Sequence, residues 1–160
     1  MIEEPLMRHP AVALTAAVGR PDSRVGEVPV LYVELKPGAT ATTDELMAFA
    51  QKEIGERAAH PKEIRILDAI PLTAVGKIYK PALYHEQVEE VLREEVKKVV
   101  GVISLHVKAD VDKRLGTVAY IEVTTRSGVE NSEMAASLRG VVGSYTFPCR
   151  LTVNGEPMAG

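Results

Sequence analysis

The same order of strand-like and helix-like segments occurs twice in this chain, and this repeat constrains the fold more than any other feature. Residues 30–35 and 118–123 are both apolar runs typical of strands, and the second stands 88 positions after the first. Helical patterns begin near Thr43 and near Asn131, at the same offset. A chain that repeats its elements in this way is predicted to fold as two similar units.

The first unit is predicted to contain helix, strand, strand, helix and strand in that order. Apolar residues dominate the two strand candidates, and Thr42 with Glu45 forms a capping-box pattern at the start of the second helix. The last strand candidate alternates between apolar and charged residues. These elements are expected at about residues 2–8, 11–18, 28–35, 42–54 and 63–68.

A long amphipathic helix at about residues 82–100 leads to the second unit. Its predicted apolar stripe consists of Val88, Val91, Leu92, Val96 and Val99. Strands near 102–108 and 149–153 would complete the repeat. The fold class is therefore α/β (α+β), with a small mixed β-sheet and flanking helices in an α-β-β-α-β unit that a second similar unit follows. Alternatively, small α/β domains in general share this order.

Composition excludes several classes of function. The chain has 160 residues, 46% hydrophobic content and a net charge of −3, which is typical of a soluble globular protein without a nucleic-acid footprint. The single Cys149 excludes an internal disulfide, and the four scattered histidines predict no metal site. No apolar run approaches the length of about 20 residues that spans a bilayer. With no signal-peptide pattern, the predicted location is the cytoplasm.

A lysine on a glycine turn is the strongest functional candidate. Residues 71–80 read Pro-Leu-Thr-Ala-Val-Gly-Lys-Ile-Tyr-Lys. Gly76 has no side chain and tolerates positive φ, so an anionic ligand could approach the backbone while Lys77 reaches it as a compact point charge. The alternative is an ordinary surface turn with a solvated lysine.

Further motifs precede this turn in a fixed order. They are His9-Pro10-Ala11-Val12, Val18-Gly19-Arg20-Pro21-Asp22 and Gly26-Glu27. Together with the lysine turn they resemble the C-terminal domain of the AMP-forming acyl-CoA synthetases, a family that also contains luciferases and the adenylation domains of peptide synthetases. The resemblance covers about residues 2–83. The predicted domains are thus a lid domain at 1–83 and a helix with an accessory α/β extension at 84–160.

The resemblance implies a two-domain ligase that joins a fatty acid or another carboxylic acid to ATP and then transfers the acyl group to coenzyme A. The small domain would rotate as a lid between these half-reactions. Lys77 would stabilise charge on the carboxylate and the phosphates during adenylation. ATP or AMP, Mg²⁺ and CoA are cofactors implied for the full-length enzyme, and none is expected to bind tightly to this fragment.

The resemblance also implies nucleotide-binding, substrate-binding or interdomain roles for Thr73, Gly76, Gly26, Glu27 and Arg20. Asp22, Arg20 and Glu27 are expected in loops, where ordinary turn and salt-bridge chemistry is the alternative. Lys80 is either a second phosphate-reaching cation or the first residue of the next helix. The resemblance further implies that Lys77, in its Pro-x-x-x-x-Gly-Lys setting, is a target of reversible acetylation, which would remove its charge.

The implied partners are an N-terminal adenylation domain, a carboxylic acid and CoA. Neither that domain nor a phosphate loop is present, and Ile78 follows Lys77 where a P-loop would have a magnesium-binding Ser or Thr. The fragment alone is therefore expected to be inactive. An exposed edge strand in the tail could allow a homodimer. The alternative function is a stand-alone, non-catalytic interaction or nucleotide-binding module.

Overall fold

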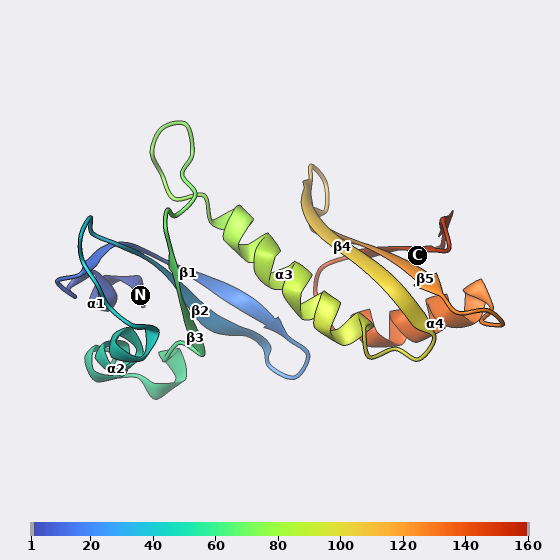
Figure 1. The fold of residues 1–160 in the computed structure, drawn as a ribbon, viewed down its shortest axis with the longest axis horizontal. Helices are drawn as coiled ribbons and strands as arrows, with labels where there is room; N and C mark the ends of the chain where they lie inside the picture. The colour runs from blue at the N-terminus through green and yellow to red at the C-terminus, as the bar shows by residue number, and fades with distance from the viewer. Residues whose placement is uncertain (1, 160) are drawn as a thin grey trace. The chain divides into compact units, whose positions relative to one another are not determined.

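The computed structural model, which describes residues 2–159, contains the predicted order of elements twice (Figure 1). Its contacts divide the chain into two units. Unit 1 comprises Met1–Arg20 and Glu27–Tyr84, and unit 2 comprises Pro21–Gly26 and His85–Gly160. The mixed α/β fold class is confirmed. The functional division into a lid and an accessory extension stays a prediction.

The first repeat has a three-stranded sheet in the order β1-β2-β3. Strands β2 and β3 are parallel, with Val30 opposite Glu63 and Glu34 opposite Leu67. The elements are α1 (Glu3–Met7), β1 (Val12–Asp22), β2 (Gly26–Leu35), α2 (Thr43–Glu53), a 3₁₀ turn (Arg57–Ala59) and β3 (Glu63–Leu67). The predicted capping box is confirmed, because Thr42 Oγ1 accepts from Glu45 N at 3.1 Å and Thr42 N donates to Glu45 Oε2 at 3.0 Å.

Both faces of this sheet are buried. Successive side chains of a strand point to opposite faces, so Leu31 and Val33 of β2 belong to one apolar cluster and Val30 and Tyr32 to another. The first cluster includes Leu6 of α1 and Leu46 of α2. The second includes Ile70 and Leu83, the residues on either side of the lysine turn. An uninterrupted apolar strand is the pattern that such two-sided burial requires.

The second repeat has a four-stranded sheet in the order β4-β5-β6-β7. Strands β4 and β5 are antiparallel, β5 and β6 are parallel, and β6 and β7 are antiparallel. The elements are α3 (Lys80–Val96), β4 (Val102–Asp112), β5 (Gly116–Thr125), α4 (Asn131–Val142), β6 (Cys149–Val153) and β7 (Glu156–Pro157). Among residues 2–159 no helix combines the length and apolarity needed to cross a membrane.

The two strand pairs are joined by the same turn. Asp22 Oδ1 accepts from Arg24 N at 2.8 Å and Val25 N at 3.1 Å, and Asp112 Oδ1 accepts from Arg114 N at 2.7 Å and Leu115 N at 3.0 Å. Each turn ends at a glycine with positive φ, Gly26 at 88° and Gly116 at 77°. The predicted repeat is confirmed. Helices α2 and α4 begin at Thr43 and Asn131, at the predicted offset of 88 positions, whereas β1 and β4 begin 90 positions apart, at Val12 and Val102.

Several sequence-based boundaries were wrong. Arg20 and Asp22 lie at the end of β1 and Glu27 lies in β2, not in loops, because the Asp22 turn lets the strands extend to its edges. Helix α3 ends at Val96, so Val99 lies in the turn that follows it and is only half-buried. Strand β7 was not predicted, although Asn154 and Gly155, with φ of 51° and 81°, form an Asn-Gly hairpin signal.

The edge of β4 is partly occupied. The backbone N–H of Ala109 donates to Glu89 Oε1 of α3 at 2.9 Å, and the N–H of Val111 donates to the Asp110 carboxylate at 2.8 Å. Satisfied edge donors are one way in which proteins discourage strand pairing between chains. A homodimer through this edge, which stays a prediction, would have to displace Glu89.

We predict that Cys149 reacts slowly with thiol reagents. Burial raises the pKa of this thiol to about 11, and the thiolate is the reactive form. At pH 8 the native chain should therefore be alkylated by iodoacetamide about 100-fold more slowly than the chain in denaturant, where the pKa is near 8.5. Mass spectrometry over time measures both rates. Equal rates in the two conditions would contradict the burial of this residue.

Candidate functional site

The lysine turn is a closed β-hairpin, here called the lysine hairpin (residues 71–79). Leu72 pairs with Ile78 in an antiparallel bridge, Thr73 N donates to Lys77 O at 2.6 Å, and Tyr79 N donates to Pro71 O at 2.8 Å. Gly76 has a φ of 80°, which explains why glycine precedes the lysine. The lysine is therefore presented on a hydrogen-bonded scaffold rather than on a free loop.

Thr73 fixes the backbone of Lys77 from two sides. Its amide donates to the carbonyl of Lys77, and its Oγ1 accepts from the amide of Lys77 at 3.1 Å. The amide of Gly76 donates to the carbonyl of Thr73 at 2.9 Å. The structure thus brings Thr73, Gly76 and Lys77 together and gives the Thr73 hydroxyl a scaffold contact. A direct contact of Thr73 with nucleotide or substrate remains a prediction.

The side chain of Lys77 is available to a ligand. Lys77 is exposed, and within residues 2–159 no carboxylate lies at ion-pair distance from its ammonium group. Leu72, Val75 and Tyr79 of the same hairpin are 50%, 81% and 42% exposed. Exposed apolar side chains gathered on one element are typical of a surface that packs against another body.

Carboxylates hold the segments on either side of the lysine hairpin. Before it, Ile70 N donates to Glu34 Oε2 of β2 at 2.8 Å. After it, Lys80 Nζ lies 2.6 Å from Glu3 Oε1 of α1. Lys80 is the first residue of α3, as one of the two predictions had it, and its ammonium group is paired with Glu3.

Glu3 also accepts from the backbone of β1, with Ala17 N at 2.7 Å from Glu3 Oε1. Burial alone would raise the pKa of Glu3, but the hydrogen bond from Ala17 and the ion pair with Lys80 outweigh burial and hold the pKa below its ordinary value of 4.5. Glu3 is therefore a carboxylate held in its charged form by two donors. No sequence motif singled it out, because its partners are distant in the sequence.

The remaining predicted site residues belong to a different element from the lysine hairpin. Gly26, Glu27 and Arg20 belong to the β1–β2 hairpin. The Glu27 carboxylate lies where a Cβ on Gly19 would be, which accounts for a glycine at that position. Burial raises the pKa of Tyr84 in α3, and the charge of Glu27 and its hydrogen bond raise it further, so Glu27 connects β2 to the start of α3.

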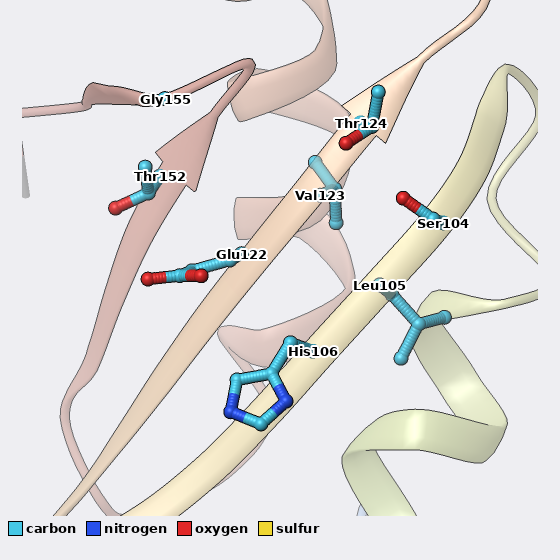
Figure 2. A pocket seen from close by; sticks show the side chains of 8 residues that line it. All are labelled: Ser104, Leu105, His106, Glu122, Val123, Thr124, Thr152 and Gly155. Carbon is cyan, nitrogen blue, oxygen red and sulfur yellow. The ribbon is translucent and has the colours of Figure 1, made fainter.

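A hollow lies on the solvent-facing side of the β4-β5-β6 sheet, with a volume of about 340 Å³ (Figure 2). His106, Glu122 and Thr152 stand in line across it, because His106 is opposite Glu122 and Glu122 is opposite Thr152. The residues that line it are Ser104, Leu105, His106, Glu122, Val123, Thr124, Thr152 and Gly155. It contains none of the predicted site residues. Across the described part of the chain, no three His, Cys, Asp or Glu side chains are arranged to hold a metal ion.

Comparison with protein families gives one match to this chain. Residues 1–77 match the family described as the AMP-binding enzyme C-terminal domain. The match ends at Lys77 and so includes α1, the first sheet and most of the lysine hairpin.

Curated relatives are CoA ligases. The marinolic acid–CoA ligase of Pseudoalteromonas sp. (strain SANK 73390) is 37% identical over 131 residues, which is 81% of this chain and 20% of that protein. An alignment of this length must extend into unit 2. The acetyl-coenzyme A synthetase of Deinococcus radiodurans is 47% identical over 79 residues, 49% of this chain and 12% of the relative. The chain therefore spans a fifth or less of the length of these relatives.

Solved structures of related proteins share the fold of about half of this chain. An acyl-CoA synthetase of Brucella canis matches with a TM-score of 0.51 and 33% identity, over 56% of this chain and 17% of that one. MatB of Rhodopseudomonas palustris matches with a TM-score of 0.50 and 25% identity, over 53% of this chain and 17% of that one.

We predict that Thr73→Val loosens the tip of the lysine hairpin while Thr73→Ser does not. Valine has the shape of threonine but cannot accept the hydrogen bond from Lys77 N, whereas serine can. Loss of one such bond, worth about 1 kcal/mol, should speed hydrogen exchange of the Lys77 amide about fivefold. Amide exchange by NMR measures this. Equal exchange in the two variants would show that the hydroxyl does not hold Lys77.

Proposed function

Because residues 1–77 of this chain belong to the AMP-binding enzyme C-terminal domain family, we propose that the chain is the lid of an ATP-dependent acid–CoA ligase. The observation that carries this proposal is the lysine hairpin: an exposed, unpaired Lys77 on a hydrogen-bonded scaffold with exposed apolar neighbours. A cation presented in this way suits a reaction that gathers negative charge in a site completed by another domain.

In the first half-reaction, a carboxylate oxygen of the acid attacks the α-phosphate of ATP and pyrophosphate leaves. Negative charge spreads over the phosphate oxygens in the transition state, so a positioned cation lowers the barrier. Lys77 supplies that cation. It acts by its charge and transfers no proton.

In the second half-reaction, the acyl group passes from the adenylate to the thiol of CoA, and AMP leaves. The lid rotates between the two steps and withdraws Lys77, because the cation is needed only while the adenylate forms. Closure and rotation of this kind commonly limit turnover. The exposed side chains of Leu72, Val75 and Tyr79 would pack against the large domain in the adenylation state.

The cofactors of this reaction are ATP and CoA, with Mg²⁺ on the phosphates. The lysine hairpin offers no carboxylate, and Ile78 follows Lys77, so these residues do not fit a metal site. Any Mg²⁺ would be held by the phosphates and the large domain. We expect these 160 residues alone to be inactive, because the adenylation site would need a large domain as well, and we place the ligase in the cytoplasm.

The acid substrate is a carboxylic acid whose pocket lies in the large domain. The relatives named for marinolic acid and for acetyl-coenzyme A differ widely in the acid that they activate. Fatty acids are one class within this range.

We expect Lys77→Ala in the intact ligase to lower the rate of acyl-adenylate formation about 100- to 1,000-fold, the usual effect of removing one transition-state charge contact. Thioester formation from supplied acyl-adenylate should stay within about twofold of the wild type. Lys77→Gln, which mimics the neutral acetylated lysine, should behave like Lys77→Ala. Pyrophosphate release and acyl-CoA formation measure the two steps.

Lys52→Ala, on the exposed side of α2, is the matched control. Equal loss in both half-reactions would refute the role of Lys77.

We also expect the native polypeptide to be several times larger than 17.3 kDa, because the relatives are five or more times as long as the matched segment. An immunoblot of source lysate with antibody against these residues measures its size. A band at 17.3 kDa would favour the alternative, a free-standing interaction or nucleotide-binding module.

A further inference from the structure

We propose that Glu3 is a positioning residue for adenylation, which holds the base of the lysine hairpin through its ion pair with Lys80. This proposal rests on the proposed role of Lys77. It assigns to Lys80 an anchoring function rather than a direct contact with phosphate.

Glu3 connects three segments that are distant in the sequence. It lies on α1, accepts from the amide of Ala17 in β1 at 2.7 Å, and pairs with Lys80 at the start of α3 at 2.6 Å. Its side chain is only 18% exposed, so solvent screens these contacts less than it would on an open surface. Charge-assisted hydrogen bonds of this kind are stronger than neutral ones.

Lys80 is well placed to transmit this restraint. It follows directly after Tyr79, whose amide closes the lysine hairpin on Pro71 O, and it stands three positions after Lys77. One helical turn further along α3, Tyr84 is held by Glu27. Residues four apart lie on the same side of a helix, so both restraints act on one side of the first turns of α3. If the first turn of α3 shifted, the end of the lysine hairpin, which leads directly into α3, would shift with it.

The second repeat provides an internal comparison. Three carboxylates hold the lysine hairpin and the start of α3, namely Glu3, Glu27 and Glu34. The residues 90 positions later are Arg93, Thr117 and Thr124, none of which is acidic. The described part of unit 2 has no lysine hairpin. The carboxylates therefore occur in the repeat that has the hairpin and are absent from the repeat that lacks it.

The competing role for Lys80 is a direct contact with phosphate. In that case Glu3 would neutralise a catalytic charge, and Glu3→Gln would leave adenylation unchanged or make it faster. If Lys80 is an anchor, Glu3→Gln and Lys80→Met both weaken adenylation and remove the same interaction. The two roles thus predict opposite results for the same variant.

The first test uses the 160-residue chain and amide exchange by NMR. In Glu3→Gln and in Lys80→Met, the protection factors of Thr73 and Tyr79 should fall about tenfold, as expected for one charge-assisted hydrogen bond. Glu4→Gln, which affects only the exposed Glu4–Arg8 pair at 3.8 Å, should leave them unchanged. Unchanged protection in Glu3→Gln, with the chain still folded, would overturn the proposal.

The pH dependence gives a second readout on the same chain. Because the folded pKa of Glu3 lies below 4.5, its stabilising effect is complete above that pH and is lost as the pH falls through the lowered folded value. Protection of Tyr79 should therefore decrease in this range in the wild type and in Glu4→Gln, and it should decrease less in Glu3→Gln, in which only Glu27 and Glu34 still hold the segments around the hairpin. An equal decrease in Glu3→Gln would assign the whole effect to those groups and would contradict the proposal.

The third test uses the intact ligase. Glu3→Gln and Lys80→Met should each slow adenylation about tenfold, the double variant should be no slower than either, and Lys80→Arg should restore the rate. Thioester formation from supplied acyl-adenylate should not change. Additive losses of adenylation rate in the double variant, or faster adenylation in Glu3→Gln, would overturn the anchoring role of Lys80. If Lys77→Ala leaves adenylation intact, the proposed function fails instead, and the exchange results still report whether Glu3 holds the hairpin.

Discussion

The burial of Val30 and Tyr32 on one face of β2 is the constraint on which the rest of unit 1 depends. Their neighbours Leu31 and Val33 pack with α1 and α2 on the opposite face. Strand β2 must therefore be apolar on both sides, because it contributes to both apolar clusters. Ile70 and Leu83 pack on the Val30 face. The lysine hairpin lies between these two residues, so apolar burial anchors the chain before and after it.

The second repeat shows what happens when that face is not apolar. The counterparts of Val30 and Tyr32 are Tyr120 and Glu122, and those of Ala16 and Val18 are His106 and Lys108. These four side chains are exposed on the open face of the β4-β5-β6 sheet, part of which forms the hollow in Figure 2. The opposite face keeps Val107, Ile121 and Leu151 buried. The repeat thus keeps the apolar layer that folds it and lacks the layer on which a lysine hairpin could rest.

Much of this architecture follows from sequence pattern. The order of elements, the Thr42 capping box, Gly76 and the exposed Lys77 depend on neighbours within a few residues, and each was predicted from such neighbours. The strand positions of Arg20 and Glu27 were not, because the extent of a strand depends on pairing across the sheet. The hairpin at Asn154-Gly155 is an exception, because a local Asn-Gly signal marks it and it was not predicted.

By itself the sequence determined the two repeats, the glycine turn that carries Lys77, and a family resemblance that the comparisons confirm. All three reside in local patterns of apolar, glycine and capping residues. Only the tertiary structure decided that Lys80 pairs with Glu3, that Glu34 holds Ile70 and that Glu27 lies over Gly19. The members of each pair lie on different segments of the chain, so they come into contact only when the strands and helices that carry them pack together.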